Sequence, residues 1–256
     1  MLITKREVRE QQERIQAILD GQDAYRVDAG DGILPAHAKS DYCYGGEYLF
    51  RGVHSPSHLD VMSDPGMRNG YLSSMVRKDK EWAFRYLYDE YNALKFVLSS
   101  EDTELPGIER IVTSPNSTVG VLWDEEGNVA HVAIQDFDEQ LRPIRFVRQC
   151  IEHGFLKRLF FGQLYLTEYH YEDDKLVRAV EIWVNKYSKK HSGGLQYKFS
   201  YGVNNEVTYE MESMEYHRDV FQLAEENLYT GTWNVNPALL QSVYDQYRLL
   251  FGVRAL

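Results

Sequence analysis

Apolar and polar residues alternate along much of the second half of the chain. In residues 195–201 the odd-numbered positions are Leu or aromatic, and the positions between them are polar. This period of two is typical of a β-strand with one buried face and one solvated face. Residues 206–212 alternate in the same way after a short turn that contains Gly202, Asn204 and Asn205. The pattern predicts a β-hairpin.

Two more segment pairs have the same arrangement of strand, polar turn and strand. Each connection carries the Gly, Asn or Asp residues that tight turns need. The three predicted hairpins are 119–124 with 129–135, 164–171 with 176–185, and 195–201 with 206–212. These hairpins predict an antiparallel sheet of about six strands.

Other segments place apolar residues at the three- and four-residue spacing of an amphipathic helix. Thr4 and Glu7 form a capping box at the start of the first of these segments, and Gly21 follows its end. Pro143 and Pro237 each suit the first turn of a later helix. The predicted helices are 4–20, 78–98, 141–160, 213–228 and 236–251.

Together these elements predict an α+β fold, in which helices pack against a central antiparallel sheet of about six strands. Residues 1–100 are expected to be a helical and irregular N-terminal region. Residues 108–256 are expected to hold the sheet and its flanking helices, and the two regions to form one compact unit. A polar stretch that ends in Pro106-Gly107 is the best candidate for a connection between them.

The charge of the chain favours a basic partner. The 256 residues include 39 Asp and Glu against 28 Lys and Arg, a formal net charge of −11. Nucleic-acid binding needs a basic surface, so this balance argues against it, and the lysines near 186–190 suit a solvated hairpin loop. The N-terminal residues lack a secretory signal, and no apolar stretch is long enough to span a membrane. We therefore expect a cytoplasmic protein.

Two histidines and a carboxylate lie within seven residues, at His54, His58 and Asp60. These side chains are common ligands of zinc and other transition metals. Pro56 stands between the histidines and disfavours the helix that would bring both onto one metal. The cluster supports a metal-dependent hydrolase as one hypothesis, and an exposed turn without metal as the other. No Cys cluster supports a metal site, and no cofactor is expected.

The tripeptide Phe50-Arg51-Gly52 follows a short apolar run. It resembles the FRG domain, which is named for this tripeptide. Together with Ser73-Ser74 and Glu210-Met211-Glu212, it also resembles ADP-ribosyltransferases of the Arg, Ser-x-Ser, Glu-x-Glu type. This second resemblance implies an NAD- or nucleotide-using enzyme in which Arg51 binds phosphate and Glu210 and Glu212 are catalytic. It rests on about eight residues, and the serines lack the x between them.

Tyrosine is the most unusual part of the composition, with 19 residues. Tyr combines a large apolar ring with one polar tip and is enriched at binding surfaces. We expect a surface of tyrosines and carboxylates to bind a basic protein, and the leading hypothesis is a module that neutralises or inhibits such a partner. The predicted contact residues are Tyr165, Tyr169, Tyr171, Glu206, Glu210 and Glu212.

Overall fold

The computed structural model describes eleven segments of the chain. They are residues 3–27, 35–44, 52–53, 71–78, 80–100, 106–153, 159–185, 192–203, 206–217, 220–226 and 229–235. The predicted helix at 236–251 lies outside these residues, so the structure does not test it.

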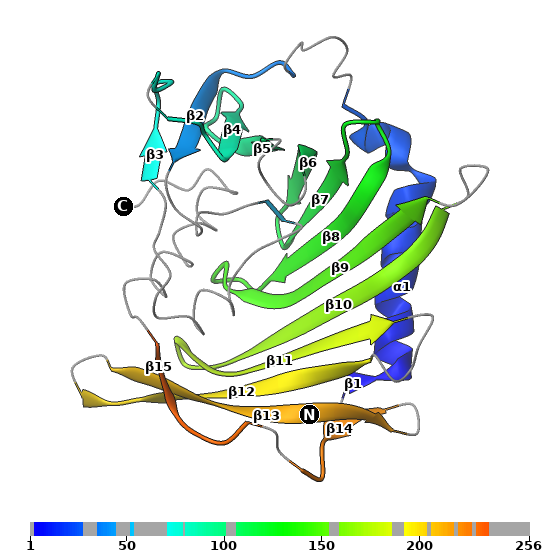
Figure 1. The fold of residues 1–256 in the computed structure, drawn as a ribbon, viewed down its shortest axis with the longest axis vertical. Coiled ribbons are helices and arrows are strands. Elements are labelled where there is room, and N and C mark those ends of the chain that lie inside the picture. Colours follow the sequence, from blue (N-terminus) through cyan, green and yellow to red (C-terminus); the bar gives the residue numbers. More distant parts are fainter. Residues whose placement is uncertain are drawn as a thin grey trace.

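The described residues form one large antiparallel sheet with one α-helix against it (Figure 1). From β4 to β14 each strand pairs with the next strand in the sequence. The order across the sheet is β1-β14-β13-β12-β11-β10-β9-β8-β7-β6-β5-β4-β2-β3, and β15 pairs with β13. The predicted α+β fold with about six strands is therefore wrong, because this sheet has 15 strands and most of the predicted helices are strands.

The strand bounds are as follows. They are β1 (Ile3–Thr4), β2 (Lys39–Tyr44), β3 (Tyr71–Ser73), β4 (Phe84–Tyr88), β5 (Leu94–Ser99), β6 (Gly107–Ser114), β7 (Ser117–Trp123), β8 (Val129–Phe137), β9 (Pro143–His153), β10 (Leu159–Glu172), β11 (Lys175–Asn185), β12 (Gly193–Tyr201), β13 (Val207–His217), β14 (Val220–Leu223) and β15 (Trp233–Val235). All three predicted hairpins are confirmed, as β7–β8, β10–β11 and β12–β13.

The N-terminal helix begins as its sequence predicts. Helix α1 (Lys5–Asp20) has Thr4 as its N-cap, and the Thr4 hydroxyl accepts a hydrogen bond from the backbone N–H of Glu7 at 3.3 Å. The Glu7 carboxylate accepts in return from the Thr4 N–H at 2.7 Å, which completes a capping box. A short 3₁₀ helix (Gln22–Tyr25) follows Gly21. The buried residues of α1 face the sheet: Val8, Gln11, Ile15 and Leu19.

The two faces of the sheet carry separate hydrophobic clusters. The helix-side face packs Val132, Val147, Leu166 and Ile182 beneath α1. The opposite face, which we call the far face, holds an aromatic cluster. Its members include Phe84, Tyr86, Tyr88, Phe137, Phe146, Tyr169, Tyr197, Phe199 and Tyr209. The tyrosines named in the far-face cluster are therefore core residues, and each buries a large apolar area.

The predicted helix at 78–98 is wrong, because this segment forms β4 and β5. Its apolar residues fit both the spacing of a helix and the alternation of a strand. Phe84, Tyr86 and Tyr88 follow the alternation, and all three are buried on the far face. Tyr91, which lies within the predicted helix, is in the turn between the two strands and is 78% exposed. Aromatic residues favour strands, and the tertiary pairing decides between the two periods.

The predicted helices at 141–160 and 213–228 are also wrong. Residues 143–153 form β9, where Pro143 begins a strand instead of a helix. Gln149 is buried in β9, and its amide donates to the carbonyl of Gly162 on β10 at 3.1 Å. Such buried polar residues obscured the alternation in the sequence. Residues 213–217 continue β13, and β14 follows them.

Candidate functional site

The residues that carry the two enzyme hypotheses lie mostly outside the described part of the chain. Arg51, His54, His58 and Asp60 all do so. Of the Phe-Arg-Gly segment only Gly52 is described, with φ of 115°, and the next residue, Val53, is buried in the far-face cluster. Among the described residues, no group of three or more His, Cys, Asp and Glu side chains is arranged to hold a metal ion.

The Glu-x-Glu pair lies on β13, and its second glutamate is held by β12. The Glu212 carboxylate accepts from the ammonium of Lys198 and from the amide of Gln196, both at 2.7 Å. These hydrogen bonds, with Lys198 the stronger influence, lower the pKa of Glu212. Glu210 is exposed. Ser73 is on β3, at the other end of the strand order from β13.

The predicted tyrosines lie on the far face and differ in exposure. Tyr169 is buried in the aromatic cluster. Tyr165 is half-buried, and the guanidinium of Arg148 lies 4.2 Å from its ring centroid. Tyr171 is half-buried at the end of β10, where Arg142 lies 4.7 Å from its ring centroid. Two of the three rings therefore already have a cation of this chain over them.

The structure does not bring the predicted tyrosines and glutamates onto one surface. Tyr197 pairs with Met211 and Lys198 pairs with Glu210 in the β12–β13 register. Since successive side chains alternate between faces, Glu210 and Glu212 point to the helix-side face, opposite the tyrosines. Of the six predicted contact residues, only Tyr171 and Glu206 lie at the same end of the strands, beside the turns that join them.

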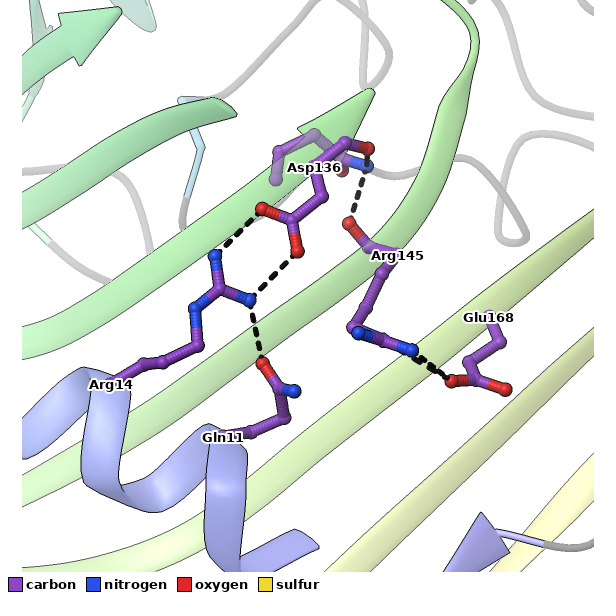
Figure 2. Close-up of polar contacts among 6 residues, drawn as sticks. Gln11, Arg14, Asp136, Arg145 and Glu168 are labelled. Atoms are coloured by element: carbon purple, nitrogen blue, oxygen red, sulfur yellow. Dashed lines mark hydrogen bonds and ion pairs between the residues drawn. The ribbon is translucent and has the colours of Figure 1, made fainter. Parts of the chain in front are cut away.

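A network of charged side chains joins α1 to the helix-side face (Figure 2). The Arg14 guanidinium donates to both oxygens of Asp136 at 2.8 Å and to the side chain of Gln11 at 2.8 Å. On the next two strands, Arg145 donates to Oε1 of Glu168 from two nitrogens at 3.2 and 2.8 Å. Asp136 and Arg145 are partners in the β8–β9 register, so charges alternate from the helix to β10. Within it, the Arg14–Asp136 pair joins α1 to β8.

The thiol of Cys150 lacks the properties of an activated nucleophile. It faces His131 in the β8–β9 register and is half-buried. Burial raises the pKa of Cys150, so the thiolate that nucleophilic catalysis requires is disfavoured. Both Cys43 and Cys150 are free cysteines.

Exposed carboxylates gather at one end of the strands. In an antiparallel meander every second turn lies at the same end, so the β8–β9, β10–β11 and β12–β13 turns are neighbours. Figure 1 shows them along the left edge of the sheet. We call these three turns the acidic rim. Its exposed carboxylates are Glu139, Glu172, Asp173, Asp174 and Glu206.

The acidic rim also carries exposed apolar side chains. Val203, in the β12–β13 turn, is 81% exposed, and Ile144, just after the β8–β9 turn, is 41% exposed. Two basic residues belong to the rim, Arg142 and Lys175, and the ammonium of Lys175 lies 5.1 Å from the ring centroid of Tyr201. Carboxylates thus outnumber cations on a surface that also offers apolar contact area.

Arg142 connects two turns of the acidic rim. Its Nε donates to Asp138 Oδ2 within its own turn at 2.7 Å, and its Nη1 donates to the carbonyl of Asp173 in the neighbouring turn. Nη1 also lies 3.4 Å from Asp174 Oδ1. Asp138 shapes the β8–β9 turn through Oδ1, which accepts from the N–H groups of Gln140 and Arg142 at 2.9 Å.

Sequence reasoning found the parts of the acidic rim but missed the surface. The acidic turn at residues 172–175 was identified as a hairpin connection, and Glu206 as a contact residue. The β8–β9 turn was missed because the segment that follows it was assigned to a helix. The missing signal was the order of the strands: acidic residues at every second turn of a meander converge on one edge.

Comparison with known proteins gives no relative: no family model, no curated protein and no solved structure matches this chain. Within the described residues, none of the helices has the length and apolar character needed to cross a membrane.

Proposed function

We propose that this protein is a binding module that recognises a basic protein partner through its acidic rim. One observation carries the proposal. Three adjacent turns at one end of the sheet expose five carboxylates together with Val203 and Ile144. Carboxylates attract and orient a basic partner, and the apolar side chains supply buried area on docking. The net charge of −11 extends the attraction beyond contact distance.

The proposed role is to neutralise or inhibit this partner by covering its basic surface. The two free cysteines suit a reducing compartment, and we propose that binding takes place in the cytoplasm. The transferase hypothesis gains no support from the described residues, because Glu212 is bound to Lys198 and Gln196 on the helix-side face. The hydrolase hypothesis rests on His54, His58 and Asp60, which lie outside the described residues.

Site-specific photo-crosslinking in the native cell tests the proposal. A benzophenone amino acid replaces Glu139 or Glu206 in the acidic rim, or Glu126 as the matched control. Glu126 is exposed in the β7–β8 turn, which lies at the opposite end of the strands. We expect Glu139 and Glu206 to crosslink the same basic protein and Glu126 not to do so. Equal crosslinking from Glu126, or an acidic captured protein, would refute the assignment.

A further inference from the structure

Arg142 is a cation placed among the carboxylates of the acidic rim, where a binding surface for a basic partner would be expected to avoid positive charge. Its side chain is only 22% exposed, because the guanidinium is enclosed by both turns and by the ring of Tyr171. Its hydrogen bonds to Asp138 and to the Asp173 carbonyl join turns that no backbone pairing connects directly. A planar guanidinium with several donors suits such a cross-link.

The two turns that Arg142 joins both have unusual backbone conformations. Leu141 has φ of 60° and Asp173 has φ of 51°, in the left-handed region that non-glycine residues rarely adopt. Leu141 immediately precedes Arg142, and Asp173 supplies the carbonyl that Arg142 binds. Contacts from surrounding residues are needed to maintain such conformations, and Arg142 supplies contacts to both turns.

We propose that Arg142 is the positioning residue of the acidic rim: it fixes the β8–β9 turn against the β10–β11 turn, so that their carboxylates meet a basic partner as one preorganised surface. This inference rests on the proposed function. Fixing the turns before binding reduces the entropy that association would otherwise cost. This gain must exceed the repulsion between Arg142 and a basic partner. The proposal therefore predicts that removing Arg142 weakens binding, although it also removes a positive charge.

The first experiment measures the geometry without a partner. Spin labels are attached at Glu139→Cys and Glu172→Cys, one in each turn, with Cys150 replaced by Ser and with Cys43 retained because its side chain is fully buried. Pulsed electron resonance gives the distribution of distances between the labels. We expect a narrow distribution with Arg142 and a broader one in both Arg142→Ala and Arg142→Lys, because Lys cannot reproduce the multiple hydrogen bonds. An unchanged distribution in both variants overturns the proposal.

The second experiment measures affinity for a defined probe, a helical peptide with Lys at every seventh position. Its charges repeat every ~10 Å, since the helix rises about 1.5 Å per residue. This matches turns that are two strand spacings apart, also about 10 Å. We expect Arg142→Ala to weaken binding several-fold although it makes the surface more negative. The control Lys175→Ala removes a rim cation whose contact is with a single ring, that of Tyr201, and is expected to strengthen binding.

The outcomes separate this inference from the proposed function. Tighter binding by Arg142→Ala, as by Lys175→Ala, shows that charge alone matters and overturns the positioning role. A wild-type protein that binds no peptide, and gives no crosslinks from the rim, removes the proposed function. A broadened distance distribution would then leave Arg142 as a structural cross-link only.

Discussion

At the scale of single residues, polar side chains on the sheet are held by partners on neighbouring strands. Gln135, Gln149 and Glu168 are all buried in the middle of long strands, and each has a hydrogen bond to β9 or β10. These bonds offset part of the cost of desolvation, although among the described residues one side-chain oxygen of each, Oε1 of Gln135 and Gln149 and Oε2 of Glu168, is buried without a hydrogen-bond partner. In the sequence, Gln149 fell in the predicted helix at 141–160, whereas Gln135 and Glu168 fell in the predicted strands at 129–135 and 164–171. No local pattern showed that these polar residues are buried.

Glu212 offers a direct test of one of these polar contacts. Its pKa is lowered by the hydrogen bond from Lys198 and, to a smaller extent, by that from Gln196. Since its pKa is lower in the folded state than in the unfolded state, the contact stabilises the protein above the usual glutamate range. This stabilisation is lost as pH falls through the lowered pKa. Lys198→Ala should raise the pKa of Glu212, as measured by NMR titration. Lys95→Ala, which breaks a pair with Asp89, should leave that of Glu212 unchanged.

At the scale of elements, the sequence predicted what depends on local signals. The capping box of α1 and the three turn-rich hairpins were confirmed. The helix at 78–98 failed because its apolar residues fit both periods, and the helix at 141–160 failed because β9 carries the buried Gln149. Residues of the predicted helix at 213–228 instead extend β13 and form β14. Without clean alternation, the choice between strand and helix depends on pairing with distant strands. The acidic rim depends on the same pairing and was therefore only partly visible.

Docking of α1 makes a prediction about stability. Arg14→Ala removes the bidentate bond to Asp136, which is 17% exposed, and leaves that carboxylate without its guanidinium. We expect the free energy of unfolding to fall by about 1–3 kcal/mol, in the range for bonds to charged groups. The matched control is Arg6→Ala on the same helix. Arg6 is 87% exposed in its pair with Glu10, so the loss should be below about 0.5 kcal/mol. Equal denaturation midpoints for the two variants would show that the network does not hold α1.

At the scale of the whole molecule, the sheet and the charge act together. A meander places successive turns alternately at the two ends of the strands, and the acidic residues of three turns meet at one end. The β7–β8 turn at the opposite end also has two exposed carboxylates, Glu125 and Glu126. They allow the same number of charges to be reversed at either end of the strands. If only the net charge matters, charge reversal at either end should have the same effect on binding. If the acidic rim is the docking surface, charge reversal at the rim should have the larger effect.

The most direct test is the association rate of the crosslinked partner, measured by surface plasmon resonance at low and high salt. One variant combines Glu139→Lys with Asp174→Lys in the acidic rim, and the other combines Glu125→Lys with Glu126→Lys; both change the net charge equally. We predict that the rim variant associates several-fold more slowly at low salt, that added salt reduces the difference, and that the β7–β8 variant stays close to wild type. Equal slowing in both variants would contradict a docking role for the acidic rim.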